Sequence, residues 1–357
     1  MFKNGGTGRR LLLFLTAMAM AAGCDTTSFT MRQPPGQQVD VFRQAVVPNV
    51  DVLWVVDNSD SMVEEQQALA DSFQDFYKFI SNTASFHIGV ISTDMHNPDH
   101  CGRLLGNPRY ITQDTENAEE VFRQNVNVGI GGTGDEQGFN AAAAALSEPL
   151  ISGHNAGFLQ EDAHLFIIFV SDEDDGSFGE VKYYLRIFES IKGKGNDGII
   201  KAAAVVGDVP EVPEECRDEK NVESGERYAE LAEGSGGIVL SICNENFAAH
   251  LDQLGFSAAG LKRHFSLSHR ADPGSIQVWV KTMCSADPMP EGVCARTIDD
   301  CRGSDEDLYG HTCVLRQALP DGYAYEEETN SIRIFGEALP PFGSVVEVGY
   351  TPEEDSY

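Results

Sequence analysis

The residues best suited to chemistry in this chain form one short segment, Asp57-Asn58-Ser59-Asp60-Ser61. The carboxylate of Asp57 and the hydroxyls of Ser59 and Ser61 recur at every second position, so a tightly coiled loop would turn all three toward one point. Carboxylate and hydroxyl oxygens are hard ligands of the kind that Mg²⁺ prefers. Because Ser and Asp before a helix also serve as helix caps, the segment taken alone fits a cap as well as a cation site.

Two other segments offer similar oxygen atoms. Ser171-Asp172 directly follows the apolar run 165–170, and a glycine-rich segment, 129–135, carries Thr133 just before a helical pattern. The chemistry of all three segments therefore depends on whether the fold brings them to the same place.

The elements that would position them alternate along residues 49–261. Short apolar runs predict strands that are buried on both faces of a parallel sheet, and residues spaced three and four apart predict helices between them. The predicted strands are 50–56, 86–91, 165–170, 199–206 and 238–242. Predicted helices carry Leu69 to Ile80, 136–145, Val181 to Phe188, Tyr228 to Ala232, and 247–254. This alternation predicts a doubly wound α/β sheet, whose ligands bind beyond the carboxyl ends of the strands.

In this setting residues 49–261 resemble the von Willebrand factor type A domain, a Rossmann-like α/β fold with a mostly parallel sheet flanked by helices. In its metal-ion-dependent adhesion site, a D-x-S-x-S segment, a loop Thr and a strand-end Asp surround one divalent cation. Carried over to this sequence, the resemblance implies the ligands Asp57, Ser59, Ser61, Thr133 and Asp172. The family usually has Gly in place of Asp60, and Thr-Asp-Gly in place of Ser171-Asp172-Glu173. Neither difference removes a ligand, although added carboxylates favour Ca²⁺ or Mn²⁺.

The resemblance also implies a function. In the family the cation keeps one position open, and a Glu or Asp of a partner protein completes it. Two carboxylates leave the cation partly uncompensated, which favours an acidic ligand. Since nothing in this arrangement activates a nucleophile, we expect a binding module for a protein ligand, dependent on Mg²⁺ (or Mn²⁺ or Ca²⁺), and no enzyme. Two alternatives stay open: a structural or assembly module with a vestigial metal site, and a metal-dependent hydrolase.

Three other motifs compete with this interpretation. The glycines of 129–134 are spaced as in a dinucleotide-binding loop, but they do not directly follow the first strand. Residues 172–176 are acidic like a calcium loop, yet their Gly stands at the fifth position instead of the sixth, so we interpret them as a solvated acidic loop. Soft and hard metal ligands gather in one loop, for which we favour chance over a dedicated site: Asp94, His96, Asp99, His100 and Cys101.

The N-terminal segment predicts export. Basic residues precede an apolar stretch, 11–22, that is too short for a membrane core of ~30 Å. Small residues then lead up to Cys24, which resembles the lipobox of bacterial lipoproteins except that Ala21 stands where Leu is more usual. The resemblance implies a signal peptide at 1–23, diacylation of Cys24, and a lipid-anchored location in the cell envelope, on the periplasmic side or the cell surface. Plain secretion with a free Cys24 is the alternative.

The remaining cysteines predict disulfides, since outside the cytoplasm cysteines pair. Cys216 and Cys243 flank a helix and a strand, and we predict a bridge between them. Two more bridges, with three possible connectivities, are predicted within one cluster: Cys284, Cys294, Cys301 and Cys313. Zinc is the alternative for this cluster, but the C-x-x-C spacing of zinc sites is missing. Cys101 is left without a partner.

Composition defines the surroundings of the α/β region. Residues 24–48 are rich in Thr, Ser, Gln and Pro and predict a tether. Residues 262–357 contain alternating β patterns at 276–280, 332–335 and 345–350 and predict a small, disulfide-containing β domain. With 56 acidic and 25 basic residues the net charge is −31, which excludes nucleic acid as a partner and leaves the lipid as the contact with a membrane. Such a surface repels an acidic ligand except where a cation sits.

Overall fold

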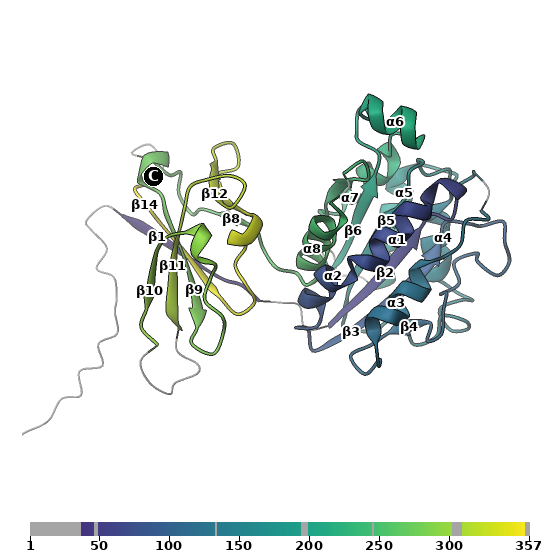
Figure 1. The fold of residues 1–357 in the computed structure, drawn as a ribbon, viewed down its shortest axis with the longest axis horizontal. Coiled ribbons are helices and arrows are strands. Elements are labelled where there is room, and N and C mark those ends of the chain that lie inside the picture. The colour runs from purple at the N-terminus through teal and green to yellow at the C-terminus, as the bar shows by residue number, and fades with distance from the viewer. Residues whose placement is uncertain are drawn as a thin grey trace, which may run out of the picture.

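A computed structural model describes residues 37–45, 49–132, 134–193, 199–244, 246–301 and 309–353, without the side chains of Glu219 and Glu291. In these ranges the chain forms a six-stranded sheet with helices and, apart from it, a five-stranded and a three-stranded sheet (Figure 1). The predicted signal peptide, Cys24 and Thr133 lie outside the described residues. The lipid anchor and the threonine ligand therefore stay predictions.

The six-stranded sheet has the strand order β4-β3-β2-β5-β6-β7. Its members are β2 (Asn49–Val56), β3 (Ser85–Ser92), β4 (Tyr110–Ile111), β5 (His164–Val170), β6 (Ile200–Val206) and β7 (Val239–Ser241). All neighbours pair in parallel except β3 and β4. The predicted mostly parallel α/β sheet is thus confirmed. Strand order runs outward from β2 and β5 in opposite directions, so the switch point, where such sheets bind ligands, lies between these two strands.

Helices cover both faces of this sheet. One face carries α1 (Val63–Asp71), α2 (Phe73–Ile80), α3 (Ala118–Val126) and α8 (Phe247–Ala258), and the other carries α4 (Gly138–Ala145), α5 (Val181–Ile191) and α7 (Glu226–Gly234). A short helix, α6 (Glu214–Lys220), and a 3-10 turn, Asp60–Met62, complete the α/β part. Strand β2 shows why both faces are covered: Trp54 lies in one apolar core, and its neighbours Leu53 and Val55 lie in the other.

The helix predicted from Leu69 to Ile80 is wrong in one respect. Its four apolar residues are all buried, but they belong to two helices, since α1 ends at Asp71 and α2 begins at Phe73. Ser72, between them, has φ −98° and ψ 6°, outside the helical range. The side-chain period survives this short interruption, so the apolar pattern could not reveal it. Helices α3 and α6 and the two-residue strand β4 were not predicted.

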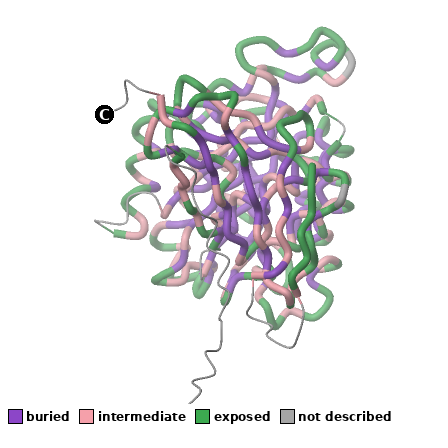
Figure 2. The backbone as a smooth tube through the Cα atoms, turned by 90° about the vertical axis from the view of Figure 1, so that its left-hand side faces the viewer, coloured by how far each residue is buried: buried purple, intermediate pink, exposed green. Residues whose placement is uncertain are grey.

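The other two sheets are antiparallel, with the orders β1-β14-β9-β11-β10 and β12-β13-β8. Their strands are β1 (Gln38–Arg43), β8 (His264–Ser266), β9 (Gln277–Met283), β10 (Cys294–Asp299), β11 (Tyr309–Leu315), β12 (Gly322–Glu326), β13 (Ser331–Phe335) and β14 (Val345–Tyr350). Three 3-10 turns accompany them, Pro273–Ser275, Glu291–Val293 and Gly336–Ala338. A separate apolar core includes Phe265, Val278 and Tyr350. Buried residues follow the strands in the interior of the molecule (Figure 2).

Strand β1 corrects part of the predicted tether. It pairs along its whole length with β14, from Gln38 opposite Tyr350 to Arg43 opposite Val345. The Asp40 carboxylate, midway along β1, accepts hydrogen bonds from the Tyr350 hydroxyl at 2.9 Å and from the Ser268 backbone N–H at 2.7 Å. An edge strand needs only a half-buried pattern, and β1 has no fully buried residue, so its sequence does not differ enough from a polar linker to be recognised.

The disulfide predictions are confirmed. Cys216 is bonded to Cys243, and the cluster forms the pairs Cys284–Cys301 and Cys294–Cys313. With all four cluster sulfurs in disulfides, the alternative zinc site is excluded in this structure. Cys101 is not in a disulfide, and its thiol donates to the Met95 carbonyl at 3.2 Å. None of the helices in the described ranges combines the length and apolar character needed to span a membrane.

Candidate metal site at the carboxyl ends of β2 and β5

The segments after β2 and β5 meet at the switch point of the sheet. Val56 and Val170 are opposite each other in the ladder, so Asp57 and Ser171 leave the sheet side by side. The Asp57 N–H donates to the Val170 carbonyl at 3.0 Å. The buried Asp57 carboxylate accepts from the Ser59 N–H at 2.7 Å and from the Ser171 hydroxyl at 2.6 Å. Its orientation is thus fixed from both strand ends.

The two serines of the D-x-S-x-S segment connect Asp57 to Asp172. The Ser59 and Ser61 hydroxyl oxygens are 3.0 Å apart, and the Ser61 hydroxyl donates to the Asp172 carboxylate. Four of the five predicted ligands therefore gather at one point. They lie on two loops that are distant in sequence, since Asp57 and Ser171 are 114 residues apart. Coiling of the loop brings the alternate positions together, as the spacing predicts.

The loop that carries the fifth predicted ligand lies against the same site on both sides of Thr133. Before it, the Gly132 N–H donates to the Asn58 carbonyl at 2.9 Å. A β-carbon at Gly132 would lie 2.5 Å from the Asn58 side-chain oxygen, so only glycine permits this approach. After it, a β-carbon at Gly134 would lie 3.9 Å from the carboxylate oxygens of Glu173. Gly132 thus contacts the loop after β2, and Gly134 lies near the loop after β5.

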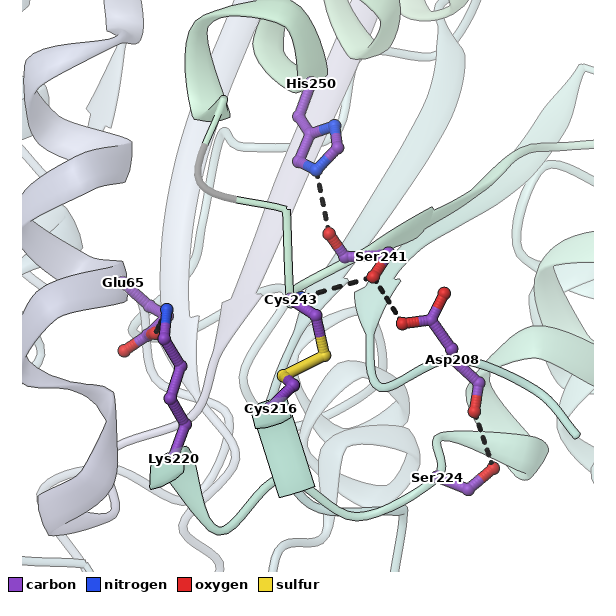
Figure 3. The surroundings of a disulfide bond; sticks show 8 residues. All are labelled: Glu65, Asp208, Cys216, Lys220, Ser224, Ser241, Cys243 and His250. Carbon is purple, nitrogen blue, oxygen red and sulfur yellow. Dashed lines mark hydrogen bonds and ion pairs between the residues drawn. A yellow bond between two sulfur atoms is a disulfide. The ribbon is translucent and has the colours of Figure 1, made fainter. Parts of the chain in front are cut away.

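Negative charge accumulates at this point without nearby compensation. Asp172 is 3% exposed. Burial, together with the charges of Asp57, Glu173 and Glu65, raises the pKa of Asp172 to about 7 although the Ser61 hydrogen bond opposes the shift. Burial and the neighbouring carboxylates also raise the pKa of Glu173 and Glu65. Among the described residues, Lys220 is a basic partner of this cluster, and its Nζ is 4.0 Å from Glu65 Oε1 (Figure 3).

Glu136 is a further member of the cluster that the sequence analysis missed. It is 2% exposed and accepts a hydrogen bond from the Thr93 hydroxyl. Burial and the charge of Asp57 raise its pKa to about 8. The expected helix start at residue 136 hid this role, because α4 begins only at Gly138 and Glu136 stands in the preceding loop, turned inward. A carboxylate three residues after a predicted ligand was the available signal.

The donor set fits a divalent cation. Asp172 Oδ1 is buried and has no hydrogen-bond partner among the described residues, and the same is true of Glu136 Oε1. Buried polar atoms are nearly always paired, and buried charges need a counter-charge. A hard cation supplies both requirements, since it accepts lone pairs from carboxylate and hydroxyl oxygens. Asp57, Ser59, Ser61 and Asp172 would hold it, and its charge would attract an anionic group.

The acidic loop after Asp172 is not solvated as predicted. Asp175 is buried: its carboxylate accepts from the Phe139 N–H at 3.0 Å and from the Arg227 guanidinium at 3.1 Å. Asp174 accepts from the Arg227 N–H at 3.0 Å. These contacts hold the loop rigidly while Phe178 stands 92% exposed at its tip. The carboxylates of Asp174 and Asp175 thus serve the loop itself.

The histidine-containing loop after β3 also has local roles. His96 Nε2 is 2.8 Å from Asp135 Oδ2, and His100 Nδ1 is 2.6 Å from the Ser92 hydroxyl. If only His, Cys, Asp and Glu side chains are counted, the described ranges contain one group of three that lie close enough to share a cation. It consists of Asp299, Cys301 and His311. Since Cys301 is bonded to Cys284, that group offers no thiolate. Neither the loop after β3 nor this group therefore forms a metal site with a cysteine ligand.

Comparisons with known proteins add likenesses of fold. No protein-family model matches the chain, and no curated protein matches it in sequence. A von Willebrand factor type A structure from Catenulispora acidiphila has a TM-score of 0.38 at 11% identity, over 92% of this chain and 67% of that one. Proximal thread matrix protein 1 from the mussel byssus, with a zinc-occupied MIDAS motif, has 0.37 at 12%, over 64% and 51%. The pilus adhesin SpaC from Lactobacillus rhamnosus GG has 0.37 at 10%, over 88% and 41%.

This chain spans about half or less of the length of the last two structures. At such low similarity these likenesses concern the path of the chain alone, so the chemistry of the site has to be argued from its own residues. What those residues make is an α/β sheet with an oxygen-lined, negatively charged site at its switch point.

Proposed function

We propose that this chain is a binding module that holds a protein ligand through a divalent cation at Asp57, Ser59, Ser61, Thr133 and Asp172. One observation carries the proposal: four of these residues are linked by hydrogen bonds at two neighbouring strand ends, and a buried carboxylate oxygen among them, Asp172 Oδ1, has no partner among the described residues. Mg²⁺ is the proposed cation, with Mn²⁺ or Ca²⁺ as substitutes. The ligand would supply an acidic residue.

The charge of the chain supports a strict dependence on the cation. At a net charge of −31, an acidic group of a partner is repelled over most of the surface. It is attracted only where a bound cation has an open coordination position. Phe178, exposed on the loop that begins with Asp172, offers an apolar contact on one of the loops of the site, and aromatic anchors of this kind dominate many protein interfaces.

We propose a binding role instead of an enzymatic one because none of the described residues of the site is an activated nucleophile. The Ser59 and Ser61 hydroxyls contact each other and a carboxylate, and the nearby His96 is engaged with Asp135. Nucleophilic catalysis needs a hydroxyl or thiol paired with a free base. Cation-dependent turnover of phosphoester or peptide substrates would instead identify a hydrolase.

Calorimetric titration of the full chain with MgCl₂ and MnCl₂ tests the cation site. Asp57→Ala should abolish the binding heat, because it removes the carboxylate that both strand ends orient. Asp114→Ala, which removes an exposed carboxylate far from the cluster in sequence, should leave the titration unchanged. Undiminished Mg²⁺ and Mn²⁺ binding by Asp57→Ala would refute the site.

Pull-down from envelope extract, with and without EDTA, tests the protein ligand. Capture that EDTA prevents supports the proposed function. Capture that survives EDTA favours the assembly module with a vestigial site, whose contacts would then lie on the β part.

We further propose that the chain is anchored to the cell envelope by lipid at Cys24. The support is the sequence resemblance to a lipobox together with three disulfides, which persist in oxidising compartments. In a bacterial host, the wild-type chain should fractionate with membranes and Cys24→Ala should become soluble. A Cys24→Ala chain that stays with membranes would refute the anchor.

A further inference from the structure

Strand β7 is an edge of the six-stranded sheet, since among the described strands it pairs with β6 alone. Ala204 N–H donates to the Ile238 carbonyl at 3.0 Å, and Ile242 N–H donates to the Val206 carbonyl at 2.9 Å. By the alternation of a β ladder, Leu240 also turns its backbone groups toward β6, while Val239 and Ser241 turn theirs away from it. The Ser241 carbonyl is taken by His250 Nε2 at 2.8 Å (Figure 3). The outward N–H and carbonyl of Val239 and the N–H of Ser241 are left facing the edge.

A groove of about 410 Å³ runs between this edge and helix α7. Its lining includes the apolar Val206 and Val239 on the face that α7 covers, whereas the side chain of Leu240 packs against the core on the other face. Both β7 residues are only partly buried, which is unusual for apolar side chains beside a covered sheet face. The groove therefore has the two parts that recognise an extended chain: backbone groups to pair with and an apolar surface for alternate side chains.

The rim of the groove is acidic. Glu226, Glu230 and Glu233 line it from α7, at spacings that place them on one face of the helix. Asp208 lines the groove just after the carboxyl end of β6, and its carboxylate accepts from the Ser241 hydroxyl at 2.5 Å (Figure 3). These glutamates form no ion pair within the described ranges of the chain.

The acidic rim does not protect the edge against pairing. Charged residues or Pro on the strand itself are among the features that block an edge strand, and β7, which is short, reads Val-Leu-Ser and has neither. The basic residue on α7, Arg227, is turned away from the glutamates toward Asp175 and the Ser177 carbonyl. The carboxylates thus face the groove with no counter-charge from their own helix.

We propose that this groove binds an extended basic segment of another protein, which adds a strand to β7. The segment's backbone would pair with Val239 and Ser241, its apolar side chains would enter the groove, and its Lys or Arg side chains would lie against the glutamates of α7. Charge complementarity selects the occupant, because three neighbouring carboxylates without counter-ions attract cations and reject acidic chains. This site is separate from the metal site, two strands away from β5 in the sheet.

Fluorescence anisotropy with the labelled, capped heptapeptide Lys-Thr-Val-Thr-Lys-Thr-Val, in which Lys and Val lie on the same face of an extended chain, tests the proposal. The full chain should bind it, and Glu226→Gln/Glu230→Gln/Glu233→Gln should bind it at least tenfold more weakly. These residues are exposed, so the variant should fold normally. The matched control, Asp114→Asn/Glu116→Asn/Glu161→Asn, removes three exposed acids elsewhere and should change the affinity less than twofold. Equal weakening by both triple variants would reduce the interaction to overall charge and overturn the proposal.

Strand addition also requires backbone hydrogen bonds, which an interaction through charge alone does not. A peptide with the same side chains but N-methylated at the amides that face β7 should bind at least tenfold more weakly, and the unmodified peptide should slow hydrogen exchange at Val239 and Ser241. An N-methylated peptide that binds equally well would overturn the proposal, as would absence of binding to the wild-type chain at about 1 mM peptide. Binding should persist in EDTA and in Asp57→Ala, so its failure and that of the metal site are separable.

Discussion

An aspartate is completely buried at each end of strand β2, and the charges around the two carboxylates are opposite. Asp51, near the start of the strand, has its carboxylate 2.9 Å from Lys192 Nζ and accepts from Gln160 Nε2 at 2.9 Å and from the Gln160 N–H at 2.9 Å. Every oxygen there has a donor, and one donor is a buried cation. This is a charge that the chain neutralises by itself.

Asp57, six residues further along the chain and directly after the same strand, is oriented equally well but not neutralised. Ser59 and Ser171 donate to it, yet its charged neighbours are the carboxylates of Asp172 and Glu136. Two buried oxygens of these neighbours have no partner within the described part of the chain. Orientation without neutralisation is the property of a site that receives its counter-charge from outside.

Burial alone therefore does not distinguish a functional carboxylate from a structural one. The distinguishing feature is whether the chain completes the charge balance. The comparison predicts that substitutions at the two ends should have opposite effects on stability, and that only one end should respond to a cation.

The largest effect is expected at Asp51. Asp51→Ala leaves the nearly buried Lys192 without its carboxylate and should lower the free energy of unfolding by about 3 kcal/mol. Urea denaturation followed by circular dichroism measures it. Asp51→Asn/Lys192→Met, which removes both charges, should recover a good part of the loss. A loss below about 1 kcal/mol in Asp51→Ala would show that the ion pair is not the stabilising contact.

A smaller effect of opposite sign is expected at Asp172. In EDTA, Asp172→Asn should leave stability unchanged or raise it by about 1 kcal/mol, because it removes one of several crowded carboxylates. In the wild-type chain, Mg²⁺ at a hundred times its dissociation constant should add about 2.7 kcal/mol, and this gain should vanish in Asp172→Asn. Thermal unfolding with and without Mg²⁺ measures both. Destabilisation of Asp172→Asn in EDTA as large as that of Asp51→Ala would erase the contrast between the two ends.

The pH dependence of stability provides the next test. The folded-state pKa of Asp172 is about 7 and that of Glu136 about 8, both raised mainly by burial. Between the ordinary values near 4 and these raised values, the folded chain binds more protons than the unfolded chain. Stability from these groups is therefore present at low pH and falls as pH rises, by up to about 1.4 kcal/mol per pH unit for each group.

Denaturation in EDTA from pH 5 to 8 should show this decline, and Asp172→Asn or Glu136→Gln should flatten it. Saturating Mg²⁺ should also flatten or reverse it, because a bound cation stabilises the ionised carboxylates. A slope that is identical in the wild-type chain and in both variants would show that these groups do not set the pH dependence.

The same two ends also show what the sequence could predict. Asp57, Ser59 and Ser61 are local: their spacing and their place after an apolar strand were enough to predict a coiled loop with converging oxygens. Asp172 was predictable because it follows a neighbouring strand of the same type. Parallel strands put their carboxyl ends on one rim, so local patterns located a site built from distant segments.

Compensation of the buried charges could not be predicted. Lys192 is 141 residues from Asp51 and Gln160 is 109 residues away, and no local pattern connects them. Glu136 was assigned to a helix because its segment looks helical, while in the structure it stands in the loop before α4 with its side chain buried. Strand β1 looked like a linker because an edge strand buries little. In each case the missing information is which distant surface a side chain meets.

Phe178 allows the test with the smallest expected effect. Its substitution should change binding of the protein ligand without changing the cation site or the stability of the fold. At 92% exposure it contributes little to folding, and Phe178→Ser should change the free energy of unfolding by less than about 0.5 kcal/mol. Its backbone is held independently of its ring: the Tyr184 hydroxyl donates to the Phe178 carbonyl at 2.9 Å, and Arg227 donates to the carbonyl of Gly179 at 3.0 Å. Mg²⁺ binding by calorimetry should therefore be unchanged.

What should fall is the EDTA-sensitive capture of a protein ligand from envelope extract, since an exposed aromatic side chain on the loop after Asp172 would be an anchor of the interface. Tyr183→Ser, which removes another exposed aromatic ring (59% exposed) on α5, provides the comparison. Equal capture by Phe178→Ser and the wild-type chain would confine recognition to the cation and the acidic residue it holds. Loss of capture with intact Mg²⁺ binding would instead show that the carboxylate cluster supplies the charge and the loop after Asp172 supplies the selectivity.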